Sequence, residues 1–228
     1  MFLVFASNNA HKLAEVRAMM PEGIKVLSLH DIGFEAEIEE TGTTLEENSS
    51  IKAETVYRWL NSDSRQPTAG IPSIDGVFAD DTGLEIDALG GEPGVYTARW
   101  HRMNDGKSAT ASLNDEMMVF AANRAKALRE LEGHTDRGCQ FRTVITLIRR
   151  SADHRPSVTQ VEGVVRGRIA TEEYGEGGFG YDPVFIPEGY NKTFGELPAE
   201  IKNQISHRAR AMEALAKVIK DNRPLRSK

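Results

Sequence analysis

The chain has 228 residues, of which 39% are hydrophobic and 27% are charged, a composition typical of a soluble globular protein with a substantial core. Its formal net charge of −6 excludes the broad basic surface that binds duplex DNA or RNA. The single cysteine, Cys139, excludes an internal disulfide and a cysteine-based zinc site, and we expect it in the core of a strand.

The N-terminal residues Phe2 to Ala6 form a continuous apolar run, which predicts a strand covered on both faces. The run is too short for a signal peptide, and no apolar stretch of the chain reaches transmembrane length. We therefore expect no membrane partner and, by default, a cytoplasmic location. A helix is predicted from Ala10 to Met20, since Leu13, Val16 and Met20 fall on one face.

The polar turn Ser7-Asn8-Asn9 stands between this strand and this helix. Such an arrangement points free backbone N–H groups at an anion. Lys12 follows in the first helical turn, where the helix dipole disfavours a cation, so it is a candidate contact for a negatively charged ligand; the alternative is a solvated lysine. No GxxxxGK[ST] or GxGxxG sequence is present at this turn, which excludes a P-loop and a dinucleotide fingerprint there.

A second acidic segment precedes a well-signalled helix. Glu39-Glu40-Thr41-Gly42 predicts a turn, and Thr44 with Glu47 fits a capping box that begins a helix running to about Leu60. Asn48 and Lys52 are four residues apart, so they share one helical face, which is either a ligand-facing surface or a solvated polar stripe.

The most unusual acidic segment is Asp80-Asp81-Thr82-Gly83. The apolar residues 77–79 predict a buried strand that ends in these two carboxylates, and Gly83 would allow a sharp turn behind them. Two carboxylates at a buried strand end need neutralisation, which Mg²⁺ supplies well when it also binds phosphate oxygens. The alternative is a polar turn in which Asp80 caps the next residues of the chain.

The remaining elements are predicted from periodicity and turn residues. Residues 61–75 predict a surface loop, and Gly90 to Gly94 predict turns. Strands are expected at Ile24–Leu29, Glu85–Ala88, Cys139–Arg149, Ser157–Ile169 and Val184–Ile186, with the third and fourth forming a hairpin. Helices are expected at Ser108–Leu131, Leu197–Lys202 and Ser206–Asp221.

The stretch from Gly175 to Pro183 carries four glycines with Phe179 and Tyr181 among them. The glycines let backbone approach a ligand closely, and the two aromatic rings are candidates to stack on a flat base. A flexible linker is the alternative, although linkers seldom carry aromatic residues. Further on, Ser206-His207-Arg208 places a cap and two donors at a helix N-terminus, a position suited to an anion or a carbonyl oxygen.

Five motifs in order resemble the inosine triphosphate pyrophosphatase family, the Ham1-like enzymes. They are Ser7-Asn8-Asn9-x-x-Lys12; Glu39-Glu40-Thr41-Gly42 with Glu47-Asn48-x-x-x-Lys52-Ala53; Ala79-Asp80-Asp81-Thr82-Gly83-Leu84; Gly178-Phe179-Gly180-Tyr181-Asp182-Pro183; and Lys202 with Ile205-Ser206-His207-Arg208. The chain departs from the family pattern in its longer 61–75 loop, in the tail at 223–228, and at Asn8, where many members have glycine.

The resemblance implies an α/β fold of the Ham1/Maf type, one domain over residues 1–228, with a long mixed sheet flanked by helices and two lobes around a central nucleotide cleft. It also implies a Mg²⁺-dependent homodimer. Asp81 would be the proton acceptor and a metal ligand, and Glu39 the other metal ligand. The triphosphate would be held by Ser7, Asn8, Asn9, Lys12, Lys52 and Thr82. Base and sugar would be held by Phe179, Gly180, Tyr181 and Asp182, and the purine would be read by Lys202, His207 and Arg208.

The expected reaction is hydrolysis of non-standard purine nucleoside triphosphates (ITP, dITP and XTP) to the monophosphate and pyrophosphate. Hypoxanthine and xanthine carry a C6 carbonyl that accepts from donors such as His207 and Arg208, whereas the adenine amino group would leave those donors unpaired. The division of roles among Glu39, Glu40, Asp80 and Asp81 stays open. The alternatives are a Maf-like pyrophosphatase acting on other modified nucleotides and a non-catalytic nucleotide sensor.

Overall fold

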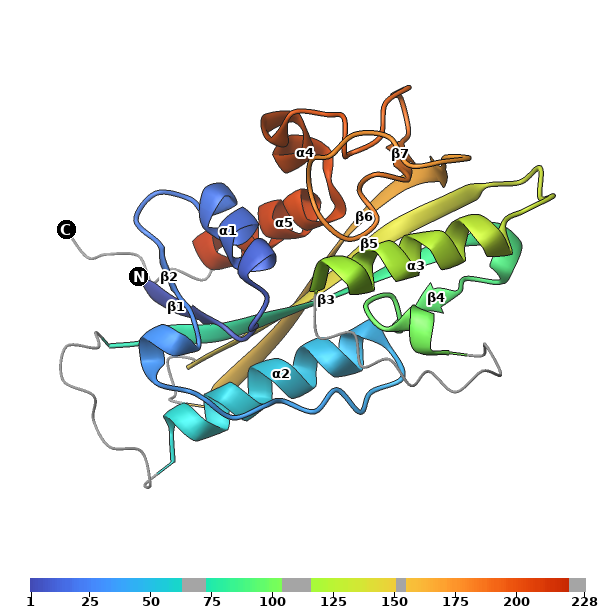
Figure 1. The fold of residues 1–228 in the computed structure, drawn as a ribbon. Coiled ribbons are helices and arrows are strands. Elements are labelled where there is room, and N and C mark those ends of the chain that lie inside the picture. The colour runs from blue at the N-terminus through green and yellow to red at the C-terminus, as the bar shows by residue number, and fades with distance from the viewer. Residues whose placement is uncertain (63–72, 104–115, 151–154, 222–228) are drawn as a thin grey trace. The chain divides into compact units, whose positions relative to one another are not determined.

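The computed structural model describes residues 1–62, 73–103, 116–150 and 155–221 (Figure 1). Its strands are β1 (Phe2–Phe5), β2 (Lys25–Leu27), β3 (Gly76–Ile86), β4 (Pro93–Gly94), β5 (Gly138–Arg150), β6 (Pro156–Ile169) and β7 (Phe185–Pro187). Its α-helices are α1 (Ala10–Met19), α2 (Leu45–Leu60), α3 (Glu116–Glu130), α4 (Ala199–Ile205) and α5 (His207–Asp221).

The strands form a mixed sheet. They are hydrogen-bonded in the order β2, β1, β3, β5, β6, β7, and β4 pairs with β3. β1 runs parallel to both β2 and β3, whereas β4 is antiparallel to β3 and β7 is antiparallel to β6. A mixed sheet with helices packed against it confirms the predicted α/β class, and the predicted strands at Cys139–Arg149 and Ser157–Ile169 are indeed neighbours.

The chain separates into two compact units. The first contains residues 1–81, 143–163 and 208–228, and the second contains residues 82–142 and 164–207. The strands β3, β5 and β6 each contribute residues to both units. The acidic and lysine-bearing motifs predicted to bind phosphate belong mostly to the first unit, and the glycine-rich aromatic stretch belongs to the second.

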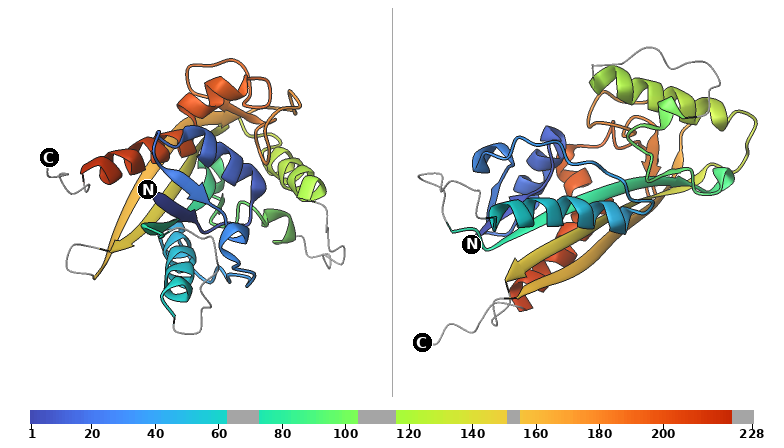
Figure 2. Two further views of the ribbon diagram at one scale, coloured as in Figure 1. Left: turned by 90° about the vertical axis from the view of Figure 1, so that its left-hand side faces the viewer. Right: turned by 90° about the horizontal axis from the view of Figure 1, so that it is seen from below.

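In the first unit, alternate residues of β1 face different helices, as the two-residue period of a strand requires. Leu3 and Phe5 pack with residues of α1 and α5 in one apolar cluster, while Val4, and Ala6 just after the strand, pack with residues of α2 in another. Figures 1 and 2 show α1 and α5 on one side of β1 and α2 on the other. Both faces of β1 are therefore covered, which explains its unbroken apolar sequence.

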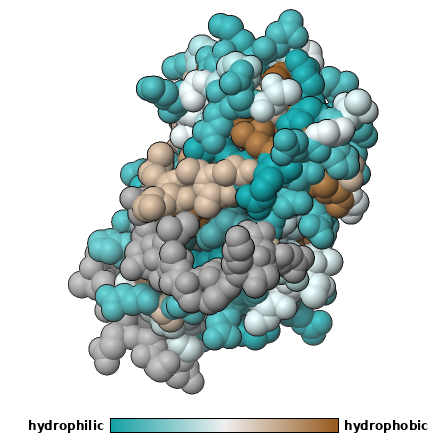
Figure 3. All heavy atoms as spheres, turned by 45° about the vertical axis from the view of Figure 1, so that its right-hand side comes forward, coloured by the Kyte–Doolittle hydropathy of each residue, from teal (hydrophilic) through white to brown (hydrophobic). Residues whose placement is uncertain are grey.

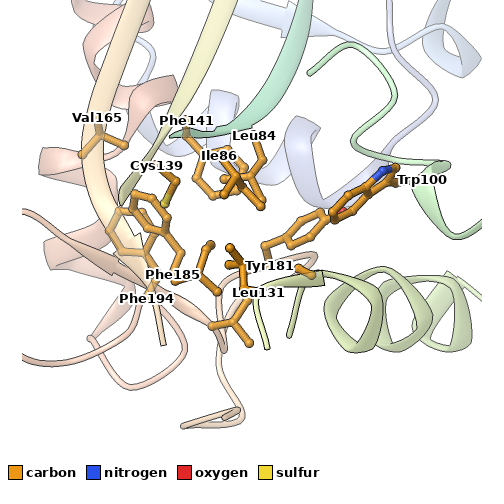
Figure 4. Close-up of a cluster of buried hydrophobic side chains, with 13 residues drawn as sticks. Leu84, Ile86, Trp100, Leu131, Cys139, Phe141, Val165, Tyr181, Phe185 and Phe194 are labelled. Atoms are coloured by element: carbon orange, nitrogen blue, oxygen red, sulfur yellow. The ribbon is translucent and has the colours of Figure 1, made fainter. Parts of the chain in front are cut away.

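In the second unit the core is aromatic. Trp100, Phe141, Tyr181, Phe185 and Phe194 pack together with aliphatic residues from β3, β6 and α3 (Figure 4).

Cys139 lies in the same core. As predicted, it is a buried free cysteine on a strand. Burial raises the pKa of its thiol to about 12, so it is not a reactive thiolate at neutral pH.

Several predicted boundaries need correction. β2 is shorter than Ile24–Leu29, because Leu29 already caps a 3-10 helix at His30–Ile32. The predicted strand Glu85–Ala88 is divided between the end of β3 and a second 3-10 helix, Asp87–Leu89. The helix predicted from Ser108 is present as α3 from Glu116; residues 104–115, and residues 63–72 of the predicted loop, lie outside the described residues.

The described surface carries few large apolar side chains. The exposed ones are Tyr96, Val158, Tyr174 and the adjacent pair Met117 and Met118 on α3. The face in Figure 3 is mainly hydrophilic, with apolar atoms in small separate groups. Within the described residues, none of the helices has the length and apolarity to cross a membrane.

Candidate active site

The two central carboxylates lie inside a strand and not in a turn, which corrects the prediction. β3 continues through Asp80, Asp81 and Gly83 to Ile86. It is held beyond the carboxylates by pairing with β4 at Leu84 and by the Leu84 N–H donated to Thr97 Oγ1 at 2.8 Å. Because successive side chains of a strand point to opposite faces, Asp80 and Asp81 face different surroundings.

Asp80 shares its face with α1 and α5. Lys12 Nζ lies 3.1 Å from Asp80 Oδ1, and Arg208 donates from Nε and Nη2 to Asp80 Oδ2, both at 3.1 Å. Arg208 also donates from Nη1 to Glu15 of α1. The result is a chain of alternating charges, Lys12–Asp80–Arg208–Glu15, that begins and ends on α1.

Burial and charge act against each other at Asp80. Burial alone would raise the pKa of this carboxyl, but the Lys12 ammonium and the Arg208 guanidinium hold it well below its usual range. For Lys12 burial prevails, and its pKa is lowered despite the Asp80 charge. Asp80 is therefore an anchor that is ionised at neutral pH and held by two cationic partners, which makes it unsuited to accepting a proton.

Asp81 shares its face with α2. Its Oδ1 lies 2.8 Å from Lys52 Nζ, and its Oδ2 lies 3.5 Å from Asn48 Nδ2. Lys52 Nζ also lies 2.8 Å from Glu40 Oε1. Burial raises the pKa of Asp81 in spite of the nearby Lys52 charge, whereas the Lys52 pKa is raised because Asp81 and Glu40 outweigh its own burial. A buried carboxylate with a raised pKa is suited to a general base.

The local sequence explains why α2 presents Asn48 and Lys52 to Asp81. The predicted capping box is present: Thr44 Oγ1 accepts the Glu47 N–H, and Glu47 Oε2 accepts the Thr44 N–H. The helix thus begins at a defined residue, and its fourth and eighth positions face β3. Asn48 Oδ1 accepts the Gly42 N–H at 2.8 Å; a Cβ at Gly42 would come within 2.7 Å of that oxygen, so this close approach needs glycine.

The remaining predicted phosphate contacts occupy the turn before α1 and the middle of β3. Asn9 is the N-cap of α1, with its side-chain oxygen accepting the Lys12 N–H at 2.9 Å. Ser7 Oγ accepts the Asn9 N–H at 3.3 Å, and Asn8 is exposed. Thr82 is half-buried in β3, in the second unit.

The two predicted metal ligands, Asp81 and Glu39, differ in their exposure to solvent. Asp81 is buried, but Glu39 is exposed, and its neighbour Glu40 is the residue that shares Lys52 with Asp81. Among the described residues, no three His, Cys, Asp or Glu side chains converge into a metal cage. The donor set fits Mg²⁺ nevertheless, since this ion takes one or two carboxylates and completes its shell with water and substrate phosphate oxygens.

In the second unit, residues 175–183, here called the aromatic loop, are held by Asp182. Its Oδ2 accepts the Phe179 N–H at 2.7 Å and lies 2.6 Å from Lys202 Nζ, which stands 4.6 Å from the centre of the Phe179 ring. Gly178 has a φ of +75°, and a Cβ there would collide with the Asp182 carboxylate. The half-buried Phe179 ring and the Lys202 ammonium are thus fixed together.

Three predicted base-binding residues are buried and contact other groups of the protein. Tyr181 does not offer its ring for stacking: it is buried in the core of Figure 4, and its hydroxyl donates to the Thr97 carbonyl at 3.1 Å. Arg208 does not reach out as a purine reader in this structure, since its guanidinium is buried on Asp80 and Glu15. His207 is buried and stacks on Phe141 with 4.8 Å between ring centres.

Three residues that the sequence patterns do not mark as functional contact predicted site residues. They are Glu15, Phe120 and Arg124. Glu15 accepts from Arg208; Phe120 lies against Phe179; Arg124 donates to the Gly180 carbonyl. A weak signal existed for Glu15, because it stands three residues after Lys12 on the same helical face. The two α3 residues carry no such local signal.

Comparison with known proteins gives a consistent result. Residues 3–218 match the sequence model of the Ham1 family. The chain is 42% identical over 215 residues to a dITP/XTP pyrophosphatase of Flavobacterium johnsoniae, covering 94% of this chain and 96% of that protein. It is 41% identical over 219 residues to a dITP/XTP pyrophosphatase of Bacillus subtilis, with coverages of 95% and 96%.

A solved structure shows the same similarity. The Ham1 protein of Staphylococcus aureus superposes with a TM-score of 0.73 at 35% identity, covering 98% of this chain and all of that chain.

Proposed function

Because this chain belongs to the Ham1 family, we propose that it hydrolyses non-standard purine nucleoside triphosphates, namely dITP, ITP and XTP, to the monophosphate and pyrophosphate. The names of the relatives at about 40% identity support this substrate class. The structural observation that carries the proposal is the buried Asp81 carboxylate, with its raised pKa, beside the Lys52 ammonium. The family assignment favours this function over that of a Maf-like enzyme.

The reaction requires an attacking water and neutralisation of charge on the phosphates. Water attacks the α-phosphorus, pyrophosphate leaves, and Asp81 accepts the proton of the water. Lys12 and Lys52 carry the positive charge that faces the triphosphate, and Ser7, Asn8, Asn9 and Thr82 contribute polar contacts. Asp80 takes no proton in this scheme; it holds Lys12 and Arg208 in place.

Mg²⁺ belongs to the proposal as the cofactor. Asp81 would hold it together with Glu39, as the family resemblance implies, or with Glu40, which already lies beside Lys52. When bound, the ion supplies charge neutralisation at the phosphate oxygens. Lys52 would then share Asp81 with the ion, which is compatible with the several lone-pair positions of a carboxylate.

The base side of the site is assigned to the second unit. Phe179 offers a ring face for stacking, Gly180 and Asp182 shape the loop around it, and Lys202 and His207 are the donors for the C6 carbonyl of hypoxanthine or xanthine. Adenine presents an amino group at that position and would leave a buried donor unpaired, which a site of this kind rejects strongly. Arg208, which the family resemblance assigns to the base, also holds Asp80 in this structure.

A homodimeric state and a cytoplasmic location complete the proposal. The homodimeric state rests on the family resemblance, and the mass of the particle in solution, measured by analytical ultracentrifugation, tests it. The cytoplasmic location is the default expectation from the sequence.

Pyrophosphate release from ITP, dITP and XTP, compared with GTP, ATP, UTP and dTTP at equal concentration, tests the proposed function. We expect turnover of the first three to exceed that of the others by at least about tenfold. A chain that binds dITP in equilibrium dialysis but releases no pyrophosphate would be a nucleotide sensor, and the enzymatic proposal would fail.

A further inference from the structure

Helix α3 contacts the aromatic loop through two side chains on one face. Arg124 Nη1 donates to the Gly180 carbonyl at 2.9 Å, and its Nε lies 3.0 Å from Glu173 Oε2. Phe120 is four residues earlier, so it shares that face, and its ring centre lies 6.1 Å from that of Phe179. The Arg124 side chain is 12% exposed, so its guanidinium interacts mainly with these partners and little with solvent.

The Arg124 contact falls at the residue directly after Phe179. Gly180 has a φ of +61°, and the turn there is closed by the Asp182 N–H donated to the Phe179 carbonyl. Besides the Asp182 side-chain contacts described above, the loop is held by backbone bonds, such as the Gly177 N–H donated to the Gly195 carbonyl. The Arg124 bond adds a charge-assisted contact from α3 at Gly180, and such bonds are stronger than neutral ones.

We propose that Arg124 and Phe120 are positioning residues that fix the Phe179 ring and, through it, set the affinity of the enzyme for the purine base. Movement of the loop tip would shift the Phe179 ring and also Lys202, whose ammonium stands over that ring and is paired to Asp182 of the same loop. This inference rests on the proposed function, since it assigns α3 to the base side of that site.

The test compares Arg124→Ala with Arg129→Ala, a control on the same helix whose side chain is 54% exposed. For Arg124→Ala we expect the KM for dITP to rise about tenfold, as for loss of a hydrogen bond from a charged donor, with kcat within about threefold. The inhibition constant of pyrophosphate, a product that has no base, stays within about twofold. The control leaves all three constants unchanged.

Two further variants separate positioning from general stability. Arg124→Lys keeps a charged donor for the Gly180 carbonyl and should recover most of the wild-type KM. Phe120→Leu keeps an apolar side chain but loses the ring contact, and should raise the KM for dITP by about threefold, a typical aromatic-pair contribution. Both remain informative where Arg124→Ala fails to fold.

Hydrogen exchange supplies a readout that does not need turnover. In Arg124→Ala, amides of the peptide covering residues 175–182 should exchange faster, while peptides of β1 and β3 keep the wild-type rates. Faster exchange in all peptides, or an equal rise in the dITP KM and the pyrophosphate inhibition constant, would overturn the inference. If the wild-type chain releases no pyrophosphate from dITP, the proposed function fails, and the exchange experiment alone decides whether Arg124 holds the loop.

Discussion

At the scale of single residues, adjacent carboxylates of one strand have opposite properties. Asp80 faces two cations and its pKa is lowered, whereas Asp81 shares one cation with Glu40 and its pKa is raised by burial. This difference in pKa indicates different roles for the two residues. Asp80 anchors the neighbouring cations, and Asp81 accepts the proton in the proposed mechanism. Two substitutions separate these roles.

Asp81→Asn should remove activity without weakening the fold. The variant keeps the size of the side chain but lacks the base, so turnover of dITP should fall at least about 100-fold. Because the folded-state pKa of Asp81 is raised, its stability contribution is present below the unfolded pKa and lost as pH rises through the folded pKa. Near neutral pH the charged form adds no stability, so the melting temperature should not fall. A destabilised but fully active variant would remove Asp81 from the mechanism.

Asp80→Asn, in contrast, should lower the free energy of unfolding. It leaves the buried Lys12 and Arg208 without their carboxylate, and breaking a buried ion pair in this way costs about 3–5 kcal/mol of unfolding free energy. The folded-state pKa of Asp80 is lowered, so its contribution is present above the unfolded pKa, about 3.9, and is lost as pH falls through the folded pKa.

Urea unfolding at pH 7 and at pH 3.5 measures this effect, and the difference between wild type and Asp80→Asn should be smaller at the lower pH. Asp31→Asn is the matched control, because Asp31 pairs with Arg17 at the surface, where such pairs contribute at most about 1 kcal/mol. Equal losses in Asp80→Asn and Asp31→Asn would contradict the anchoring role.

At the scale of elements, two helices are defined by their first turns. α1 begins at the Asn9 cap and places Lys12 on the Asp80 face of β3, and α2 begins at the Thr44 capping box and places Lys52 on the Asp81 face. Each lysine reaches its carboxylate because the helix start is fixed to the residue. A change at a cap should therefore affect both stability and the site.

Thr44→Ala removes the hydroxyl that accepts the Glu47 N–H, and we expect the unfolding free energy to fall by about 1 kcal/mol. The kcat/KM for dITP should fall as well, because fraying of the first turn displaces Asn48 and Lys52. Thr44→Ser keeps the hydroxyl and is the control; it should retain both stability and activity. If Thr44→Ser loses as much stability as Thr44→Ala, the methyl packing and not the cap is responsible.

At the scale of the whole molecule, the candidate residues are divided between the two compact units. The first holds the carboxylates and lysines proposed for the phosphates, and the second holds the aromatic loop, Lys202 and His207 proposed for the base. Metal dependence and base recognition should therefore respond to different substitutions.

Metal removal tests the first of these assignments. Pyrophosphate release should vanish in EDTA and return with excess Mg²⁺, because the donor set contains only oxygen ligands. Glu39→Gln and Glu40→Gln, titrated with Mg²⁺ side by side, decide which glutamate joins Asp81: the true ligand should show the larger rise in the Mg²⁺ concentration for half-maximal activity. Full activity of a metal-stripped sample would remove the metal from the proposal.

The amino-acid sequence by itself determined the elements whose signals are local. The apolar run of β1, the capping box of α2 and the periodicity that predicts the terminal helix are all encoded by neighbouring residues, and the structure confirms each of these elements. The shared face of Asn48 and Lys52 is set by helical spacing alone, and both side chains do contact one carboxylate.

Only the tertiary structure decided which charges meet. Whether β3 turns or continues at Asp81 depends on Thr97 and β4, which lie beyond any local pattern. Arg208 is 128 residues from Asp80 in the sequence. A guanidinium at a helix start can bind a base carbonyl or a carboxylate equally well, and only the fold decides which of the two lies beside it. Likewise Tyr181 became a core residue because Thr97 satisfies its hydroxyl inside the protein. Pairing of buried polar groups is set by proximity in space, which the order of residues along the chain does not contain.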